Sequence, residues 1–182
     1  LGEDGRTDVG KALGKIGRML EEGADIIDIG ACSTRPGAPE IPENEEWTRL
    51  RPLLEEMKVS FPQVTFSIDT YRASIVRNAL GIFPYFIVND ISAGEDDSRM
   101  LGTVGDAGLG YVAMHKRGNP RTMQSLCDYA DVTDEVCGYF DGFAEKAERA
   151  GIRDWILDPG FGFAKTVEQN YELLSEMGRF GR

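Results

Sequence analysis

The stretch DWILDPGFGFAKT (154–166) begins as an apolar, strand-like run and ends in polar residues suited to chemistry. Four earlier stretches repeat this order: ADIIDIGACSTRPG (24–37), VTFSIDT (64–70), YFIVNDISAG (85–94) and GYVAMH (110–115). Helix-like patterns lie between them. Strands that alternate with helices, with polar loops always after the strand, are typical of a (β/α) barrel, whose active site is built from those loops.

The spacing of apolar residues predicts where the individual elements lie. We expect parallel strands, adjacent in sequence order, at 26–29, 65–69, 86–90, 111–114 and 155–158. Helices are predicted at 7–22, 44–57, 72–80, 96–107 and 133–150, and a last helix begins with the Thr166–Gln169 capping box. In the second helix Asn44 is the expected cap, and Pro52 is expected to mark a break.

The number of strands predicts an incomplete barrel. A complete barrel of this kind has eight strands in ~250 residues, whereas five runs are found in these 182 residues. We therefore interpret the chain as α/β, a (β/α)8 TIM barrel with about five of its parallel strands, in one domain over 1–182. The first and the last two strands of the barrel are expected outside this sequence.

Composition excludes several classes of protein. Apolar residues make up 41% of the chain, as in folded proteins, and the net charge of −11 argues against a nucleic-acid partner. No apolar run approaches the ~20 residues that span a bilayer, and the N-terminus does not resemble a signal peptide. Three cysteines without a CxxC pair favour reduced thiols in a cytoplasmic protein.

Carboxylates and an amide end three of the predicted strands. Asp69 closes SIDT, Asn89 and Asp90 close IVND, and Asp158 begins DPGFGF. A buried carboxylate is costly without donors, so several of them imply a ligand, or fixed protein groups, rich in N–H groups. For Asp69 and Asp158 together we favour a ligand. A heterocycle with an amino-pyrimidinone edge donates two parallel hydrogen bonds and suits such carboxylates. For Asp90 we favour a different role, as the cap of a helix.

The loops after the first and fifth strands carry further candidates. STRPG (33–37) offers a hydroxyl and a guanidinium that suit phosphate oxygens, although Arg35 could instead pair with the acidic run at 43–46. Phe163 could pack on an aromatic substrate or in the core. Lys165 could hold an anion or be solvated. His115 is the only histidine and is interpreted as structural.

These segments resemble dihydropteroate synthase, of the pterin-binding TIM-barrel superfamily. The matching segments, in family order, are DIIDIGACSTRPGAPE (25–40), SIDTYR (67–72), IVNDISAG (87–94), MHKRGNPRTMQ (114–124) and LDPGFGFAKTVEQNYELL (157–174). Corrinoid-dependent methyltransferases share the pterin-binding barrel, but STRPG together with the MH..G.PRTMQ segment resembles the synthase branch.

The resemblance implies an enzyme of folate biosynthesis. A 7,8-dihydropterin that carries a hydroxymethyl pyrophosphate condenses with p-aminobenzoate, giving 7,8-dihydropteroate and pyrophosphate. By position, Asp69, Asn89 and Asp158 would bind the pterin and Met114 would line its pocket. Mg²⁺ would assist departure of pyrophosphate, but its expected ligand lies before Leu1, and no metal ligand is expected in this segment.

The same resemblance assigns the other half of the site. Thr34 and Arg35 would be the catalytic residues that contact pyrophosphate or help to order the site over the leaving group, and Pro36 and Phe163 would border the p-aminobenzoate slot. The implied partners are small molecules, with neither nucleic acid nor membrane, and a homodimer is kept open. The implied location is cytoplasmic, and the family is a sulfonamide target.

Departures from the family pattern leave an alternative open. The family's Ser-Arg-Lys and Arg-x-His segments are not in this sequence, and Ala31–Cys32 and Ala164 replace residues common in the family. The alternative is a pterin-binding module without synthase chemistry, such as a methyltetrahydrofolate-binding domain of a corrinoid methyltransferase or a degenerate paralogue. We expect the segment alone to be inactive.

Overall fold

The computed structural model of the chain describes residues 8–32, 41–118 and 122–180. Its centre is one parallel sheet with the strand order β1-β2-β3-β4-β5. The strands are β1 (Ile27–Gly30), β2 (Phe66–Asp69), β3 (Ile87–Asp90), β4 (Gly110–Met114) and β5 (Trp155–Asp158). Each predicted strand is present, and each pairs in parallel with the next along the chain, so the predicted order is confirmed.

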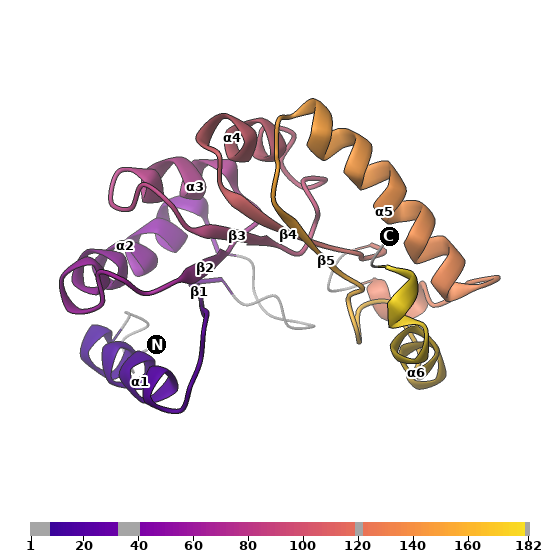
Figure 1. Cartoon of the computed structure of the whole chain (residues 1–182), viewed down its shortest axis with the longest axis horizontal. Coiled ribbons are helices and arrows are strands. Elements are labelled where there is room, and N and C mark those ends of the chain that lie inside the picture. Colours follow the sequence, from indigo (N-terminus) through magenta and orange to yellow (C-terminus); the bar gives the residue numbers. More distant parts are fainter. Residues whose placement is uncertain (1–7, 33–40, 119–121, 181–182) are drawn as a thin grey trace.

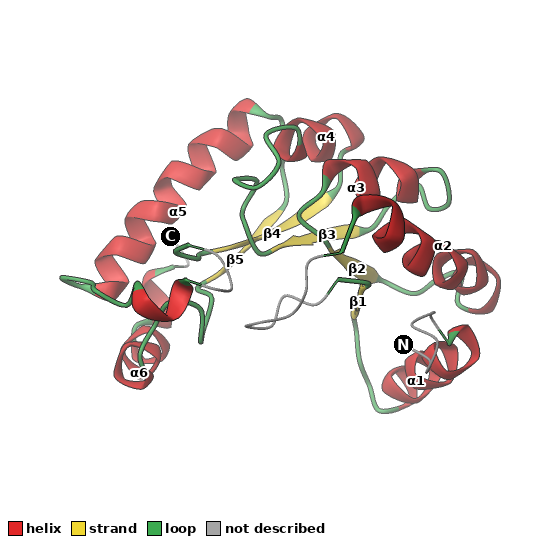
Figure 2. Ribbon diagram, turned by 180° about the vertical axis from the view of Figure 1, so that it is seen from behind, coloured by secondary structure: helices red, strands yellow, loops and turns green. Residues whose placement is uncertain are grey.

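In the described part of the chain, six α-helices connect and flank the strands. They are α1 (Val9–Glu21), α2 (Glu43–Ser60), α3 (Ala73–Leu80), α4 (Met100–Ala107), α5 (Val132–Arg149) and α6 (Val167–Ser175), with short 3₁₀ turns at Met123–Ser125 and Met177–Arg179. The views from opposite sides show these helices along the outer, convex side of the curved sheet (Figure 1, Figure 2). The described helices leave the concave side of the sheet uncovered.

The hydrophobic core lies between the convex face of the sheet and the helices. Alternate residues of β1 and β2, such as Ile27, Ile29 and Ile68, are buried there. Leu54 and Met57 of α2 are fully buried against the same core. Apolar side chains on every second strand residue therefore direct one face of the sheet toward the helices, and the residues between them lie on the other face.

Two predictions about the second helix were wrong. The helix begins at Glu43 with Pro42 in the N-cap position, so Asn44 does not cap it. Acidic residues in its first turn interact favourably with the positive end of the helix dipole. The helix also continues through Pro52, because Leu50 and Leu54 on either side of the proline are buried in the core and hold both halves in place.

Side-chain hydrogen bonds also set where two other helices begin. Helix α4 begins at Met100 rather than at 96, since the side chain of Asp97 accepts hydrogen bonds from the backbone of Arg99 and of Ala73. At α6 the predicted capping box is confirmed: Thr166 accepts from the backbone of Gln169, and the Gln169 side chain accepts in return. The α6 box fixes the helix start immediately after the β5 loop.

Candidate active site on the concave face of the sheet

The strand register places the predicted pterin residues on one face. In a parallel sheet, residues paired across strands point to the same side. Asp69 pairs with Asn89, and Met114 pairs with Asp158. Since Asn89 also pairs with Val112, two residues before Met114 on β4, all four side chains lie on the concave face. Strands β2 to β5 thus bring Asp69, Asn89, Met114 and Asp158 together on that face.

The Asp69 carboxyl on this face has a raised pKa. Burial, followed by the nearby charges of Asp28, Glu46 and Asp90, raises its pKa to about 7. A carboxyl with this pKa is protonated in a large fraction of molecules at neutral pH. A ligand that donates N–H groups to it favours the ionised form and would complete the charge balance that the protein leaves open.

Asp28 belongs to the same face, although it was not predicted as a site residue. Its Oδ1 accepts a hydrogen bond of 2.5 Å from the Ser67 hydroxyl and one of 3.3 Å from the Asn89 amide nitrogen. With its NH₂ group directed at Asp28, the Asn89 carbonyl is left to accept from a ligand. The alternation of apolar and polar residues in IIDIG could have placed Asp28 on this face, because Ile27 and Ile29 are buried on the opposite face.

Asp90 lies on the opposite, convex side, paired with Ala113. It does not cap a helix, so that prediction was wrong. Its carboxylate accepts from the backbone and hydroxyl of Ser92, from the Gly94 backbone and from the Tyr111 hydroxyl, and burial raises its pKa. Four donors explain how this buried carboxyl is accommodated, and they give it a structural role in the turn after β3.

Asp158 begins a tightly held loop between β5 and α6. Its Oδ1 accepts a 2.8 Å hydrogen bond from the Gly160 backbone. Gly160 has a φ of +69° and lies so close to β4 that an added Cβ would be 2.1 Å from the His115 carbonyl oxygen. Phe163 donates its backbone N–H to the Gly160 carbonyl, and its ring, which the same loop carries, is half-buried. Its contact with a substrate stays a prediction.

One of the two roles predicted for Lys165, that of a solvated cation, was wrong. The side chain is 4% exposed, and it contacts His115, which is 3% exposed. Lys165 is therefore not solvated, and its ammonium is directed into the loop. His115 lies against the ring of Tyr139 at 4.9 Å between centroids, in agreement with its predicted structural role.

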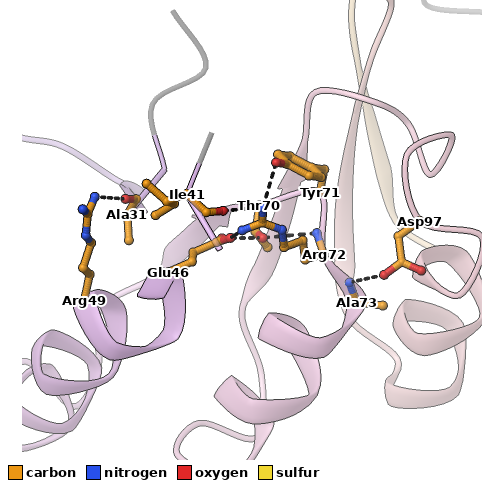
Figure 3. Close-up of polar contacts among 9 residues, drawn as sticks. All are labelled: Ala31, Ile41, Glu46, Arg49, Thr70, Tyr71, Arg72, Ala73 and Asp97. Carbon is orange, nitrogen blue, oxygen red and sulfur yellow. Dashed lines mark hydrogen bonds and ion pairs between the residues drawn. The ribbon is translucent and has the colours of Figure 1, made fainter. Parts of the chain in front are cut away.

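Two arginines hold the ends of the β1–α2 connection (Figure 3). Arg49 donates to the Ala31 carbonyl, and Arg72 donates to the Ile41 carbonyl. Arg72 also forms an ion pair with Glu46, which is 1% exposed and accepts a 2.7 Å hydrogen bond from the Thr70 hydroxyl. These contacts anchor the strand and helix from which the connection departs.

The predicted residues Thr34, Arg35 and Pro36 belong to 33–40, which lie outside the described residues. Within the described ranges, no group of three or more His, Cys, Asp or Glu side chains is arranged to hold a metal ion. A search of the same ranges finds no helix with the length and apolar character needed to cross a membrane.

Comparison with known proteins identifies the family of this chain. A family model described as pterin binding enzyme matches residues 3–182. The chain belongs to the pterin-binding enzyme family. The match confirms the resemblance drawn from the strand-end motifs, and it covers all four concave-face residues predicted to bind pterin.

Individual members of the family are similar to this chain over nearly its whole length. The dihydropteroate synthase of Synechocystis sp. is 39% identical over 173 residues, which are 94% of this chain and 59% of that relative. The Burkholderia cenocepacia dihydropteroate synthase complexed with 7,8-dihydropteroate is 38% identical, with a TM-score of 0.86, over 96% of this chain and 62% of that one.

A further solved structure agrees with these two. The Xanthomonas albilineans dihydropteroate synthase with 4-aminobenzoic acid is 33% identical and has a TM-score of 0.87, over 99% of this chain and 64% of that one. The chain thus spans less than two thirds of each of these relatives. Their barrels confirm the predicted α/β TIM-barrel class, of which the five described strands form a consecutive part.

Proposed function

We propose that this chain is part of a dihydropteroate synthase and carries the pterin-binding side of its active site. The observation that supports it best is the convergence of Asp69, Asn89 and Asp158, from three different strands, on the concave face. The Burkholderia relative, bound to 7,8-dihydropteroate, supports this choice of ligand. The proposed substrates are a dihydropterin with a hydroxymethyl pyrophosphate and p-aminobenzoate.

The three polar groups suit the donor edge of a pterin. Asp158 uses Oδ1 for the Gly160 backbone and keeps Oδ2 for a ligand. Asn89 gives its NH₂ to Asp28 and presents its carbonyl. Asp69 accepts once it is ionised. Together they form a set of acceptors, which favours a heterocycle rich in N–H groups over an anionic ligand.

The reaction needs a nucleophile and a leaving group on either side of one carbon. The amine nitrogen of p-aminobenzoate attacks the methylene carbon of the pterin substrate and loses a proton, while the bond from that carbon to the pyrophosphate oxygen breaks. We assign Thr34 and Arg35 to the departing pyrophosphate, because a guanidinium stabilises developing phosphate charge. Pro36 and Phe163 are assigned to the p-aminobenzoate slot.

Several assignments stay predictions from the sequence. Mg²⁺, implied by the resemblance, would supply further charge stabilisation to the leaving group, and we assign it to none of the described side chains. The homodimer and the cytoplasmic location are likewise predictions from the sequence. None of them is needed for the acceptor set on the concave face.

The decisive experiment measures dihydropteroate formation by the full-length protein that contains this chain. We expect turnover that requires both the pterin pyrophosphate and p-aminobenzoate and releases pyrophosphate in equal amount. Residues 1–182 expressed alone should be inactive. A full-length protein that binds dihydropterin but forms no product would instead support a binding module without synthase chemistry.

A further inference from the structure

The ammonium group of Lys165 is surrounded by three acceptors. Its Nζ lies 3.0 Å from His115 Nδ1, 3.1 Å from the Gly160 carbonyl oxygen and 3.0 Å from the Phe163 carbonyl oxygen. A protonated lysine has three N–H donors. Each donor therefore has a partner, which is the condition under which a buried ammonium is tolerated.

His115 can accept this hydrogen bond only as a neutral ring with its proton on Nε2. Burial, followed by the charges of Lys165 and Arg117, lowers the pKa of His115 to about 3, so the ring is neutral at physiological pH. Burial lowers the pKa of Lys165 to about 8, with the charge of Asp158 acting in the opposite direction. Lys165 is thus mainly protonated at neutral pH, as three acceptors require.

The two carbonyls belong to a loop whose backbone conformation needs external support. Gly160, Gly162 and Ala164 all have positive φ, at +69°, +81° and +52°. For Ala164 this region is sterically unfavourable, and its side chain is fully buried. Hydrogen bonds from Lys165 bind the loop from inside, and His115 connects Lys165 to the end of β4.

We propose that Lys165 and His115 are positioning residues that fix Asp158 and Phe163 in the geometry needed for substrate binding. This inference rests on the proposed function. Neither residue needs to touch a substrate, because Lys165 binds the two carbonyls between which the loop turns. The Gly160 backbone that bonds to Asp158 and the backbone that carries Phe163 are held by the same ammonium.

Two pairs of substitutions test this role in the full-length enzyme. Lys165→Met keeps the volume of the side chain and removes its three donors. Lys146→Met, on the exposed side of α5, is the matched control. His115→Leu removes the acceptor, whereas His115→Asn places an amide oxygen near the position of Nδ1. We expect Lys165→Met and His115→Leu to raise KM for p-aminobenzoate about tenfold, with a smaller fall in kcat.

The matched variants make the test specific. His115→Asn should recover much of the affinity lost in His115→Leu, and Lys146→Met should leave both constants unchanged. A merely structural role would lower the amount of folded enzyme, hence kcat, without changing KM. If Lys165→Met does not fold, the His115→Asn and His115→Leu pair decides, and equal KM values for these two would overturn the proposal.

An independent readout does not depend on turnover. In ¹⁵N NMR spectra, the His115 signal, assigned by its loss in His115→Asn, should show an unprotonated Nδ1 and a protonated Nε2. Backbone hydrogen exchange at Phe163 should accelerate in Lys165→Met. A wild-type protein without turnover would refute the proposed function alone. A protonated Nδ1, or unchanged exchange at Phe163, would refute the positioning role.

Discussion

Replacing Asp28 with asparagine should change the pH at which the concave face binds pterin. The charge of Asp28 is the second cause, after burial, of the raised pKa of Asp69, ahead of Glu46 and Asp90. The introduced amide oxygen can still accept hydrogen bonds from Ser67 and Asn89, so the substitution mainly removes a charge. The pKa of Asp69 should fall from about 7, and its ionised, ligand-accepting form should appear at lower pH.

The size of the shift follows from Coulomb's law. Asp28 pairs with Ser67, two residues before Asp69, so the two carboxyl groups are diagonal neighbours on β1 and β2. Side chains in this relation are ~7 Å apart. Two unit charges at ~7 Å repel by about 0.6 kcal/mol in bulk water and about 2.4 kcal/mol at an effective dielectric constant of ~20. These energies correspond to about 0.4 to about 1.7 pH units. We therefore expect the midpoint to fall by roughly one unit, within that range.

The stability of the protein should change in a related way. Because the folded-state pKa of Asp69 is raised above its ordinary value of 3.8, folding becomes less favourable as the pH rises from 3.8 through about 7. Asp28→Asn reduces this loss. The variant should therefore gain more stability relative to wild type at pH 7 than at pH 4.

Calorimetry with a dihydropterin from pH 5 to pH 9, on the full-length protein, measures the midpoint. Carboxyl ¹³C NMR, with the Asp69 signal assigned by its loss in Asp69→Asn, measures the pKa directly. Asp106→Asn, at an exposed position of α4 on the convex side, makes the same charge change away from the site. A midpoint that moves equally in Asp106→Asn and Asp28→Asn would refute the reasoning, as would an unchanged midpoint in Asp28→Asn.

Three further predictions concern named contacts. Asp158→Asn should keep the hydrogen bond to the Gly160 backbone but turn an NH₂ toward the ligand, and calorimetry should show pterin binding weaker by roughly 2–5 kcal/mol; unchanged affinity would remove Asp158 from the site. Glu46→Gln weakens the buried ion pair with Arg72 and should lower the free energy of unfolding, measured in urea, by about 2 kcal/mol. Glu45→Gln, in the half-exposed pair with Arg49, should lower it by less than ~1 kcal/mol. Gly105→Ala should destabilise the protein by about 1–3 kcal/mol, because the added Cβ would lie 1.8 Å from a carbonyl oxygen of the α5–β5 connection. Gly102→Ala in the same helix adds a Cβ that meets no atom and should stabilise the protein by up to ~1 kcal/mol. Similar melting temperatures for the two variants would contradict this.

Strand-end chemistry was predictable because its signals are local. The five apolar runs gave the strands, and the polar residues after them gave Asp69, Asn89 and Asp158. Period-two alternation also separates Asp90, on the convex face, from Asn89 beside it. The role of Asp90 was nevertheless misjudged. Three of its four donors come from Ser92 and Gly94 in a turn where no helix begins, and the fourth, Tyr111, lies on the next strand.

Contacts between distant residues explain the remaining errors. Asp28 reaches Ser67 and Asn89, which are 39 and 61 positions away, so its part in the site requires the register of the sheet. Burial of Lys165 depends on His115, 50 positions earlier. Pro52 remains inside a helix because of the core beneath it. In each case tertiary packing overrides the local preference of the sequence.

The parallel register has a consequence for how the protein folds. Every group of the acceptor set comes from a separate βα unit, and no two of them are neighbours in the chain. Contacts of such long sequence separation form late, after chain segments of tens of residues have been closed. A pterin that contacts β2, β3 and β5 therefore binds only the assembled sheet, and by mass action it stabilises that state against the opening of any single unit. Ligand-dependent slowing of hydrogen exchange should thus extend across all three strands.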